Sequence, residues 1–169
     1  MAYQQHIDDA KAVRVNVAIV TLSDTRTPET DTSGQTIRKL LEDAGYNVTA
    51  YGVQSDDPES LKRTLGRHLA AGNVDAIITN GGTGISRRDL AIPAIESLIE
   101  IRLPGFGELF RMLSYEQIGS GALASRATAG VVQGKLIFAL PGSTKAVELG
   151  MTKLIIPELK HLVGQLHKR

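Results

Sequence analysis

The sequence contains no cysteine and no tryptophan, and only 4% of its 169 residues are aromatic. Without cysteine, the chain can form no disulfide, no thiolate zinc site and no cysteine-bound iron–sulfur cluster. The scarcity of aromatic side chains and the net charge of +1 argue against a nucleic-acid-binding surface. Any metal ion is therefore expected to be a hard cation such as Mg²⁺, held by carboxylates and substrate phosphates.

Long apolar runs are also missing. No stretch approaches the roughly 18 apolar residues that a membrane-spanning helix needs, and the start of the chain lacks the apolar core of a signal peptide. We therefore expect a cytoplasmic protein without membrane contact. Its length fits one domain over residues 1–169, with residues 1–12 as a flexible N-terminal arm.

Apolar runs of strand type alternate with helical patterns along the first hundred residues. Strands are predicted over residues 13–22, 46–53 and 76–80. Each is followed by a segment with apolar residues on one helical face, which is typical of an α/β protein with a parallel sheet. Two later strands, 127–132 and 136–140, are joined by Gln133-Gly134-Lys135. This short link predicts a hairpin, so the sheet should be mixed but mostly parallel.

Capping signals separate structural aspartates from the others. Asp57 directly precedes Pro58, which suits the first position of a helix, so Asp57 is the predicted N-cap. Its neighbour Asp56 is then left without a structural role. Pro93 is predicted to begin another helix, which places Asp89 too far upstream to cap it. The sequence does not decide whether Asp56 or Asp57 contacts a metal ion.

A glycine-rich loop follows the third predicted strand. Residues 81–84 read Gly-Gly-Thr-Gly and are followed by Arg87, Arg88 and Asp89. Glycines allow the backbone to approach a ligand, and N–H groups in such a turn bind anions. The spacing matches neither a P-loop nor a dinucleotide-binding fingerprint. Loops 23–26 and 141–145 also follow strands, and strand ends line the ligand crevice of open α/β sheets. The three loops therefore predict a phosphate-binding site.

The candidate site residues come mainly from these loops. The predicted substrate- and nucleotide-binding residues are Ser23, Asp24, Gly81, Gly82, Thr83, Gly84, Arg88, Ser125, Arg126, Pro141, Gly142, Ser143 and Lys145. Asp56 and Asp89 are the candidate catalytic and metal-binding carboxylates, because two carboxylates with Mg²⁺ suit phosphoryl-group transfer. Ser23 and Asp24 are equally well explained as turn formers, and Ser125-Arg126 as a solvated strand start.

Seven short blocks occur along the chain in a fixed order. They are Leu22-Ser23-Asp24, Asp31-Thr32-Ser33-Gly34, residues 79–84, Arg88-Asp89, residues 104–108, Ser125-Arg126 and residues 140–143. In these blocks the sequence resembles the MoaB/MogA molybdenum cofactor biosynthesis family, over about residues 13–157. The length and the short Pro-Gly-Ser-Thr-Lys form of the last block are closer to the MoaB branch.

This resemblance implies a three-layer α/β/α molybdopterin-binding fold that forms homotrimers, or homohexamers in the MoaB branch. Other cofactor-synthesis enzymes are implied as further partners. The implied reaction is adenylyl transfer, in which the molybdopterin phosphate attacks the α-phosphorus of Mg·ATP and releases pyrophosphate. Family members use two aspartates, of which one matches Asp89 and the other aligns best with Asp56. Some MoaB-branch members lack the second aspartate and are inactive, whereas this chain has it.

Two other functions stay open on the sequence alone. A non-catalytic carrier oligomer in the same pathway would bind molybdopterin through the glycine loops without needing Mg·ATP. A nucleotide-binding regulatory domain of flavodoxin-like topology would bind flavin or nucleotide without pterin, and the seven ordered blocks speak against it.

Overall fold

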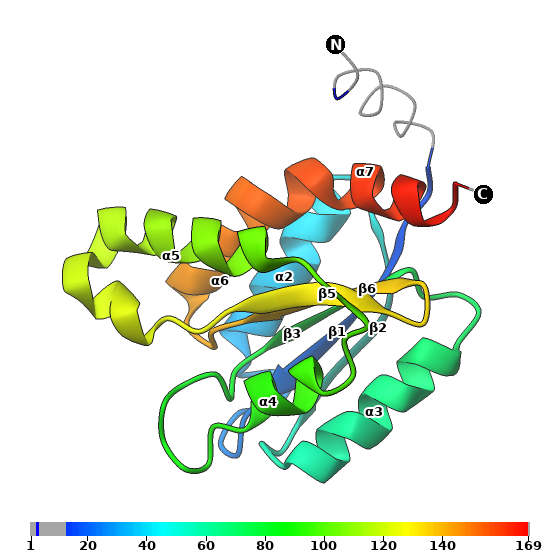
Figure 1. The fold of residues 1–169 in the computed structure, drawn as a ribbon. Helices are drawn as coiled ribbons and strands as arrows, with labels where there is room; N and C mark the ends of the chain where they lie inside the picture. The colour runs from blue at the N-terminus through cyan, green and yellow to red at the C-terminus, as the bar shows by residue number, and fades with distance from the viewer. Residues whose placement is uncertain (1–2, 4–12, 169) are drawn as a thin grey trace.

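The computed structural model describes residue 3 and residues 13–168. The predicted flexible arm over residues 1–12 therefore lies outside the described residues, except for Tyr3. A six-stranded sheet forms the centre of the molecule, in the order β2-β1-β3-β6-β5-β4 (Figure 1). Its strands are β1 (Asn16–Leu22), β2 (Asn47–Gln54), β3 (Ala76–Asn80), β4 (Ile101–Arg102), β5 (Thr128–Val132) and β6 (Lys135–Leu140).

The strand pairing confirms the predicted mixed sheet. β1 pairs in parallel with β2 and β3, and β3 pairs in parallel with β6. β5 runs antiparallel to both β4 and β6. The predicted hairpin joins β5 to β6 through Gln133 and Gly134, whose φ angles are +49° and +72°. Two successive positive φ angles are what a tight two-residue hairpin turn requires.

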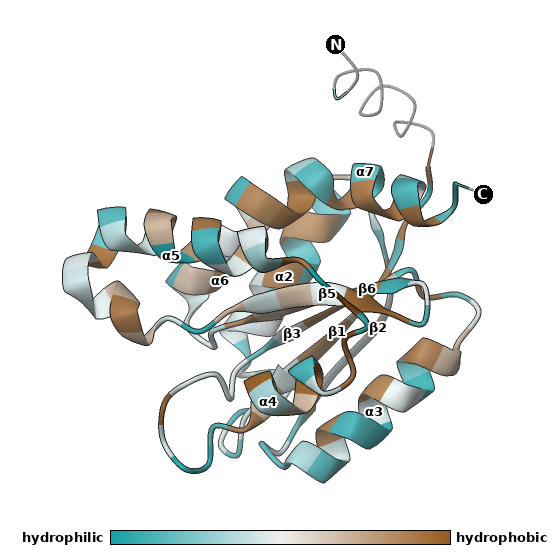
Figure 2. Ribbon diagram, in the orientation of Figure 1, coloured by the Kyte–Doolittle hydropathy of each residue, from teal (hydrophilic) through white to brown (hydrophobic). Residues whose placement is uncertain are grey.

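Helices cover both faces of the sheet, which confirms the three-layer α/β/α fold. One face carries α2 (Thr32–Asp43), α5 (Pro104–Ile118), α6 (Thr144–Gly150) and α7 (Ile156–Leu166). The other face carries α3 (Pro58–Ala70) and α4 (Ala91–Glu96). Each helix buries an apolar side against the strands, and the exposed side is largely hydrophilic, as α3 illustrates (Figure 2).

The chain leaves β1 and β3 toward opposite faces of the sheet. β1 leads to α2 on one face, whereas the neighbouring β3 leads to α4 on the other. The two connections therefore diverge at the carboxyl ends of adjacent parallel strands. In open α/β sheets, ligands bind in the crevice that such a divergence creates.

The start of one helix differs from the sequence prediction. α4 begins at Ala91 after Leu90, so the prediction that Pro93 starts this helix is wrong. Pro93 is the third helical residue, and it fits there because N–H groups of the first helical turn need no partner within the helix. Ahead of Pro157, the chain widens into a π-helical turn, η2 (Met151–Ile155), before α7. No helix of the described residues is long and apolar enough to cross a membrane.

Candidate functional site

The glycine loop after β3 lies against the loop after β6. The Gly81 N–H donates to the Leu140 carbonyl over 3.1 Å. A Cβ on Gly142 would lie 3.2 Å from the Gly81 Cα, so the two backbones are in close contact. Because β1, β3 and β6 are parallel neighbours, their carboxyl ends meet at one edge of the sheet. The predicted gathering of loops at this edge is confirmed.

The glycines of this loop are required by conformation and by space. Gly81 and Gly82 have φ angles of +94° and +64°, which residues with a side chain rarely adopt. A Cβ on Gly82 would overlap Asp56 Oδ1, and a Cβ on Gly84 would lie 2.6 Å from Asp89 Oδ2. The glycine loop therefore packs directly against both candidate carboxylates.

The two adjacent aspartates after β2 have different environments. Asp57 caps α3, because its Oδ2 accepts a hydrogen bond from the Ser60 N–H over 2.6 Å. Asp56 does not cap the helix, and its N–H donates to Asp24 Oδ1 over 3.1 Å. Burial raises the pKa of Asp56, and the charges of Asp89 and Asp24 raise it further. The predicted division of roles is confirmed for the cap, and Asp56 belongs to a carboxylate cluster.

The backbone of its own loop stabilises the carboxylate of Asp89. The Ser86 N–H donates to Asp89 Oδ2 over 2.9 Å, and Leu90 rather than Asp89 precedes α4. Hydrogen bonding to Ser86 lowers the pKa of Asp89, and the nearby Arg126 and Arg88 lower it further. The prediction that Asp89 does not cap the helix is confirmed. Its carboxylate is nevertheless positioned by the Ser86 backbone.

The guanidinium of Arg126 donates hydrogen bonds to the backbone of the glycine loop. Its Nε donates to the Thr83 carbonyl over 3.1 Å and its Nη2 to the Asp89 carbonyl over 3.2 Å. The guanidinium therefore fixes the backbone on both sides of Gly84. Ser125 precedes it at the end of a short 3₁₀ helix, η1 (Gly119–Ala124). Sequence reasoning predicted a phosphate contact for Arg126, whereas its observed partners are backbone carbonyls.

Arg26 is a site residue that sequence reasoning missed. Its Nη1 donates to the Gly142 carbonyl over 3.1 Å and to Ser33 Oγ over 3.2 Å. Ser33 Oγ donates to the same Gly142 carbonyl over 2.7 Å. Arg26 and Ser33 thus connect the loop after β1 and the start of α2 to the loop after β6. The available signal was the position of Arg26 in the loop that follows a predicted strand.

The remaining predicted residues are placed as follows. Ser23 Oγ accepts from the Arg26 N–H over 3.1 Å and so forms the turn after β1. Ser143 caps α6, where its Oγ accepts from the Ala146 N–H over 3.2 Å. Lys145 is exposed and lines a hollow beside Gln117 of α5. Ser23 and Ser143 therefore have local structural partners, and the side chain of Lys145 is exposed.

The oxygen ligands offered by Asp24, Asp56 and Asp89 are of the type that a hard cation such as Mg²⁺ would take. The charges of Asp89 and Asp24 raise the pKa of Asp56, and the charge of Arg88 counteracts this rise. A bound cation would offset this excess of negative charge. Within the described residues, no group of three or more His, Cys, Asp or Glu side chains could enclose a metal ion. Mg²⁺ commonly binds one or two carboxylates and takes its other ligands from phosphates and water.

Comparison with known proteins identifies the family. A family model described as "Probable molybdopterin binding domain" matches residues 18–161. The molybdenum cofactor biosynthesis protein B of Bacillus cereus is 49% identical over 156 residues, which cover 92% of each chain. A crystal structure of a molybdenum cofactor biosynthesis protein B matches with a TM-score of 0.91 and 49% identity, covering 93% of this chain and 98% of that one. The tungsten cofactor synthesizing protein MoaB from Pyrococcus furiosus matches with a TM-score of 0.84 and 32% identity, covering 92% and 98%. The chain therefore belongs to the molybdopterin-binding family of molybdenum cofactor biosynthesis proteins, in its MoaB branch.

Proposed function

We propose that this protein is a molybdopterin adenylyltransferase that transfers AMP from Mg·ATP to the phosphate of molybdopterin. The observation that carries the proposal is the packing of Asp56 and Asp89 against opposite parts of one glycine loop. Both carboxylates lie at the edge where the connections from β1 and β3 diverge. A glycine loop for phosphate beside two metal-binding carboxylates is an arrangement suited to phosphoryl-group transfer.

In the proposed reaction, a phosphate oxygen of molybdopterin forms a bond to the α-phosphorus of ATP. The bond from that phosphorus to the bridging oxygen of the β-phosphate breaks, and pyrophosphate leaves. The attacking phosphate is already ionised, so Asp56 and Asp89 need not remove a proton. Their role is to hold Mg²⁺, which when bound neutralises charge on the triphosphate.

The glycine loop would bind phosphate through its backbone. Within residues 13–168, the N–H groups of Gly82, Thr83 and Gly84 donate to no protein acceptor. Adjacent unpaired N–H groups in a glycine turn form an anion-binding concavity. Arg126 would maintain this shape, because its guanidinium holds the Thr83 and Asp89 carbonyls. Arg88 is exposed beside Asp56 and would add positive charge for a phosphate group.

An adenylylation assay tests the proposal. Pure protein incubated with molybdopterin and Mg·ATP should produce pyrophosphate and adenylyl-molybdopterin. Asp89→Asn and Asp56→Ala should lower kcat by roughly 10²-fold or more, the scale for losing one electrostatic stabiliser. Asp56→Ala should change pterin affinity little, because the residue is assigned to Mg·ATP.

Asp57→Ala is the matched control for the two carboxylate variants. It removes the neighbouring carboxylate, which caps α3, and should leave kcat near the wild-type value. The catalytic proposal fails if the wild-type protein forms no product and Asp89→Asn behaves identically. The assignment of Asp56 fails if Asp57→Ala is the variant that loses activity. Pterin binding without ATP binding in calorimetry would favour the carrier function instead.

We also propose that the protein acts as a homo-oligomer, a trimer or hexamer as the family resemblance implies. Large exposed apolar side chains are concentrated between β4 and η1. They are Ile101, Leu109, Met112, Tyr115, Ile118 and Leu123. An apolar surface of this kind marks a protein contact. Sedimentation analysis should give an oligomer that Met112→Glu weakens and that Lys39→Glu, a charge reversal on the exposed side of α2, leaves intact. A monomeric wild-type protein would contradict the proposal.

A further inference from the structure

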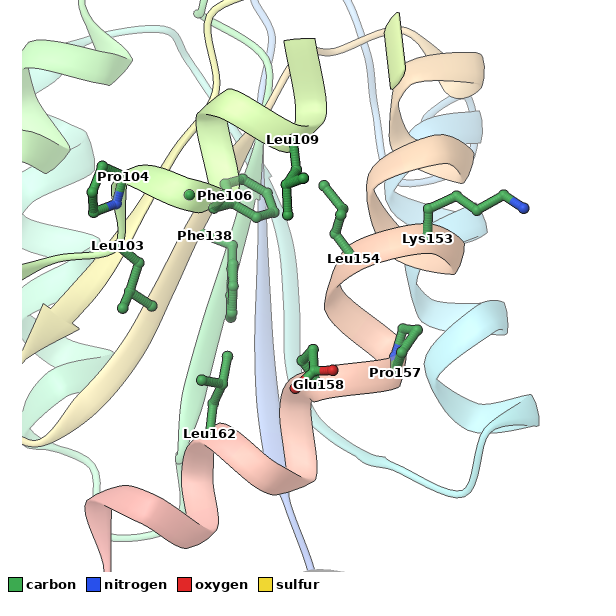
Figure 3. A pocket seen from close by; sticks show the side chains of 11 residues that line it. Leu103, Pro104, Phe106, Leu109, Phe138, Lys153, Leu154, Pro157, Glu158 and Leu162 are labelled. Carbon is green, nitrogen blue, oxygen red and sulfur yellow. The ribbon is translucent and has the colours of Figure 1, made fainter. Parts of the chain in front are cut away.

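The apolar hollow between the start of α5 and α7 is unsuited to an anionic ligand. Its volume is about 420 Å³. Figure 3 shows Leu103, Phe106 and Leu154 around a common space, with Lys153 pointing away from it. The carboxylate-bearing Glu158 also lines the hollow, and its charge would repel a phosphate group. The loops at the carboxyl edge of the sheet are the better source of phosphate donors.

In these loops, Arg26 has donors that the protein does not use. Its Nη1 donates to the Gly142 carbonyl over 3.1 Å and to Ser33 Oγ over 3.2 Å. Within residues 13–168, its Nε and Nη2 donate to no protein acceptor, and neither atom is buried. The side chain is 33% exposed, so a ligand in solution can reach it. A guanidinium binds phosphate best through two parallel N–H groups, which these two nitrogens offer.

The nearby carboxylate of Asp31 does not occupy these donors. Asp31 Oδ1 lies 3.5 Å from Arg26 Nη1, the same nitrogen that contacts Gly142. A bidentate ion pair would instead use two guanidinium nitrogens at about 2.7–2.9 Å. Asp31 is fully buried, and it already accepts from the Gly34 N–H and the Tyr51 hydroxyl. Pairing with Asp31 therefore accounts for Nη1 alone.

Hydroxyl groups extend the set of donors beside Arg26. Ser33 Oγ lies 3.2 Å from Thr144 Oγ1, which lies 3.2 Å from Thr32 Oγ1. These residues belong to the first turns of α2 and α6, which lie side by side on one face of the sheet (Figure 1). Thr32 is exposed and Thr144 is half-buried, so their hydroxyls can turn to donate to a ligand. Guanidinium and hydroxyl groups together suit a phosphate that carries no metal ion.

The carboxylates and Arg26 stand at the two ends of one series of contacts. Asp56 packs against Gly82 of the glycine loop. The preceding Gly81 contacts Gly142, whose carbonyl accepts from Arg26. A phosphate that arrives with Mg²⁺ is attracted to carboxylates through the ion. A phosphate without a metal ion is repelled by them and requires a cation of the protein instead. The two ends therefore suit two different phosphates.

We propose that Arg26 binds the phosphate of the substrate that arrives without magnesium, through its free Nε and Nη2. The identity of that substrate rests on the proposed function, in which it is molybdopterin and the magnesium-bound substrate is ATP. Arg26 thus holds the attacking phosphate, while its Nη1 fixes the Gly142 backbone. The carboxylates at the other end hold the magnesium ion of the triphosphate.

Calorimetric titration of the full-length protein tests this assignment without turnover. Molybdopterin is titrated alone, and the magnesium complex of a non-hydrolysable ATP analogue is titrated separately. Arg26→Gln should weaken molybdopterin binding roughly 10- to 100-fold, the scale for hydrogen bonds to a charged group. It should leave binding of the ATP analogue near the wild-type value. Added salt should weaken molybdopterin binding to the wild type, and less steeply to Arg26→Gln, because one screened charge is missing.

Three further variants separate phosphate binding from support of the loop. Arg26→Lys keeps the charge beside Asp31, so it should retain the salt dependence and lose less affinity, and it carries the test if Arg26→Gln does not fold. Ser33→Ala removes the other donor to the Gly142 carbonyl and keeps the guanidinium, so it should weaken binding much less. Arg38→Gln removes an equal charge from the exposed side of α2 and should change neither affinity.

The proposal is wrong if Arg26→Gln and Arg26→Lys keep the wild-type affinity for molybdopterin, or if the affinity for the ATP analogue falls instead. It is also wrong if Ser33→Ala reproduces the whole loss, because Arg26 would then act only through Gly142. These results would leave the proposed adenylyl transfer intact. A protein that forms no adenylylated product, but loses molybdopterin affinity on Arg26→Gln, would support this assignment and contradict the proposed function.

Discussion

Replacing Asp31 with alanine should destabilise this protein well beyond the loss of an ordinary helix cap. Asp31 is fully buried at the start of α2. Its carboxylate accepts from the Gly34 N–H over 3.0 Å and from the Tyr51 hydroxyl over 2.8 Å. Arg26 Nη1 lies 3.5 Å from it. One side chain therefore connects α2, β2 and the loop that reaches Gly142.

The magnitude follows from the bonds that would be lost. Loss of the cap costs about 1 kcal/mol. The half-buried Tyr51 hydroxyl would keep only the Pro28 carbonyl, 3.5 Å away, as a protein acceptor, and this loss costs about 1–3 kcal/mol at most. Arg26 retains Ser33 and Gly142 as partners and adds little. The sum is about 2–4 kcal/mol, or a fall in Tm of roughly 4–16 °C for a chain of this length.

The assay is chemical and thermal unfolding at one fixed protein concentration, compared across matched variants. Asp57→Ala removes the exposed cap of α3 and should cost only about 1 kcal/mol. Tyr51→Phe combined with Asp31→Ala should cost less than the two single changes added together, because no hydroxyl is left without an acceptor. The reasoning is refuted if Asp31→Ala costs no more than Asp57→Ala, or if the double variant is strictly additive.

Three further predictions concern the carboxylates and their loop. Burial and the charges of Asp89 and Asp24 raise the pKa of Asp56 above its ordinary 3.8, so ionisation of Asp56 disfavours folding. Without Mg²⁺, Asp56→Asn should therefore stabilise the protein, and this gain should grow as the pH rises from about 3.8 through the raised pKa. Urea unfolding at a series of pH values measures the gain. Gly82→Ala should abolish adenylylation, because its Cβ would overlap Asp56. Gly45 has a similar positive φ but open space around it, so Gly45→Ala should cost about 1–2 kcal/mol of stability and leave activity intact. Arg126→Lys should lower kcat in the same assay because one ammonium cannot reproduce the two guanidinium bonds to Thr83 and Asp89, and unchanged kinetics would contradict its positioning role.

Much of the fold could be predicted because its signals are local. The apolar runs, the Asp57-Pro58 cap and the Gln133-Gly134 turn each specify a short segment from neighbouring residues, and all three are confirmed. The start of α4 was misplaced because proline fits several positions of a first helical turn, and residue pattern alone does not choose among them. The sequence by itself also determined the family, through blocks whose order along the chain is specific.

Only the tertiary structure decided which of these segments meet. Arg26 and Gly142 are separated by 116 positions in the chain, and no periodicity or capping rule links them. The same holds for Asp56 beside Gly82 and for Tyr3 beside Glu158. Such contacts depend on parallel strand pairing and on helices packing across the sheet, which are set by burial over the whole domain. The sequence therefore determined which residues are available for the candidate site, and the fold decided how they are combined.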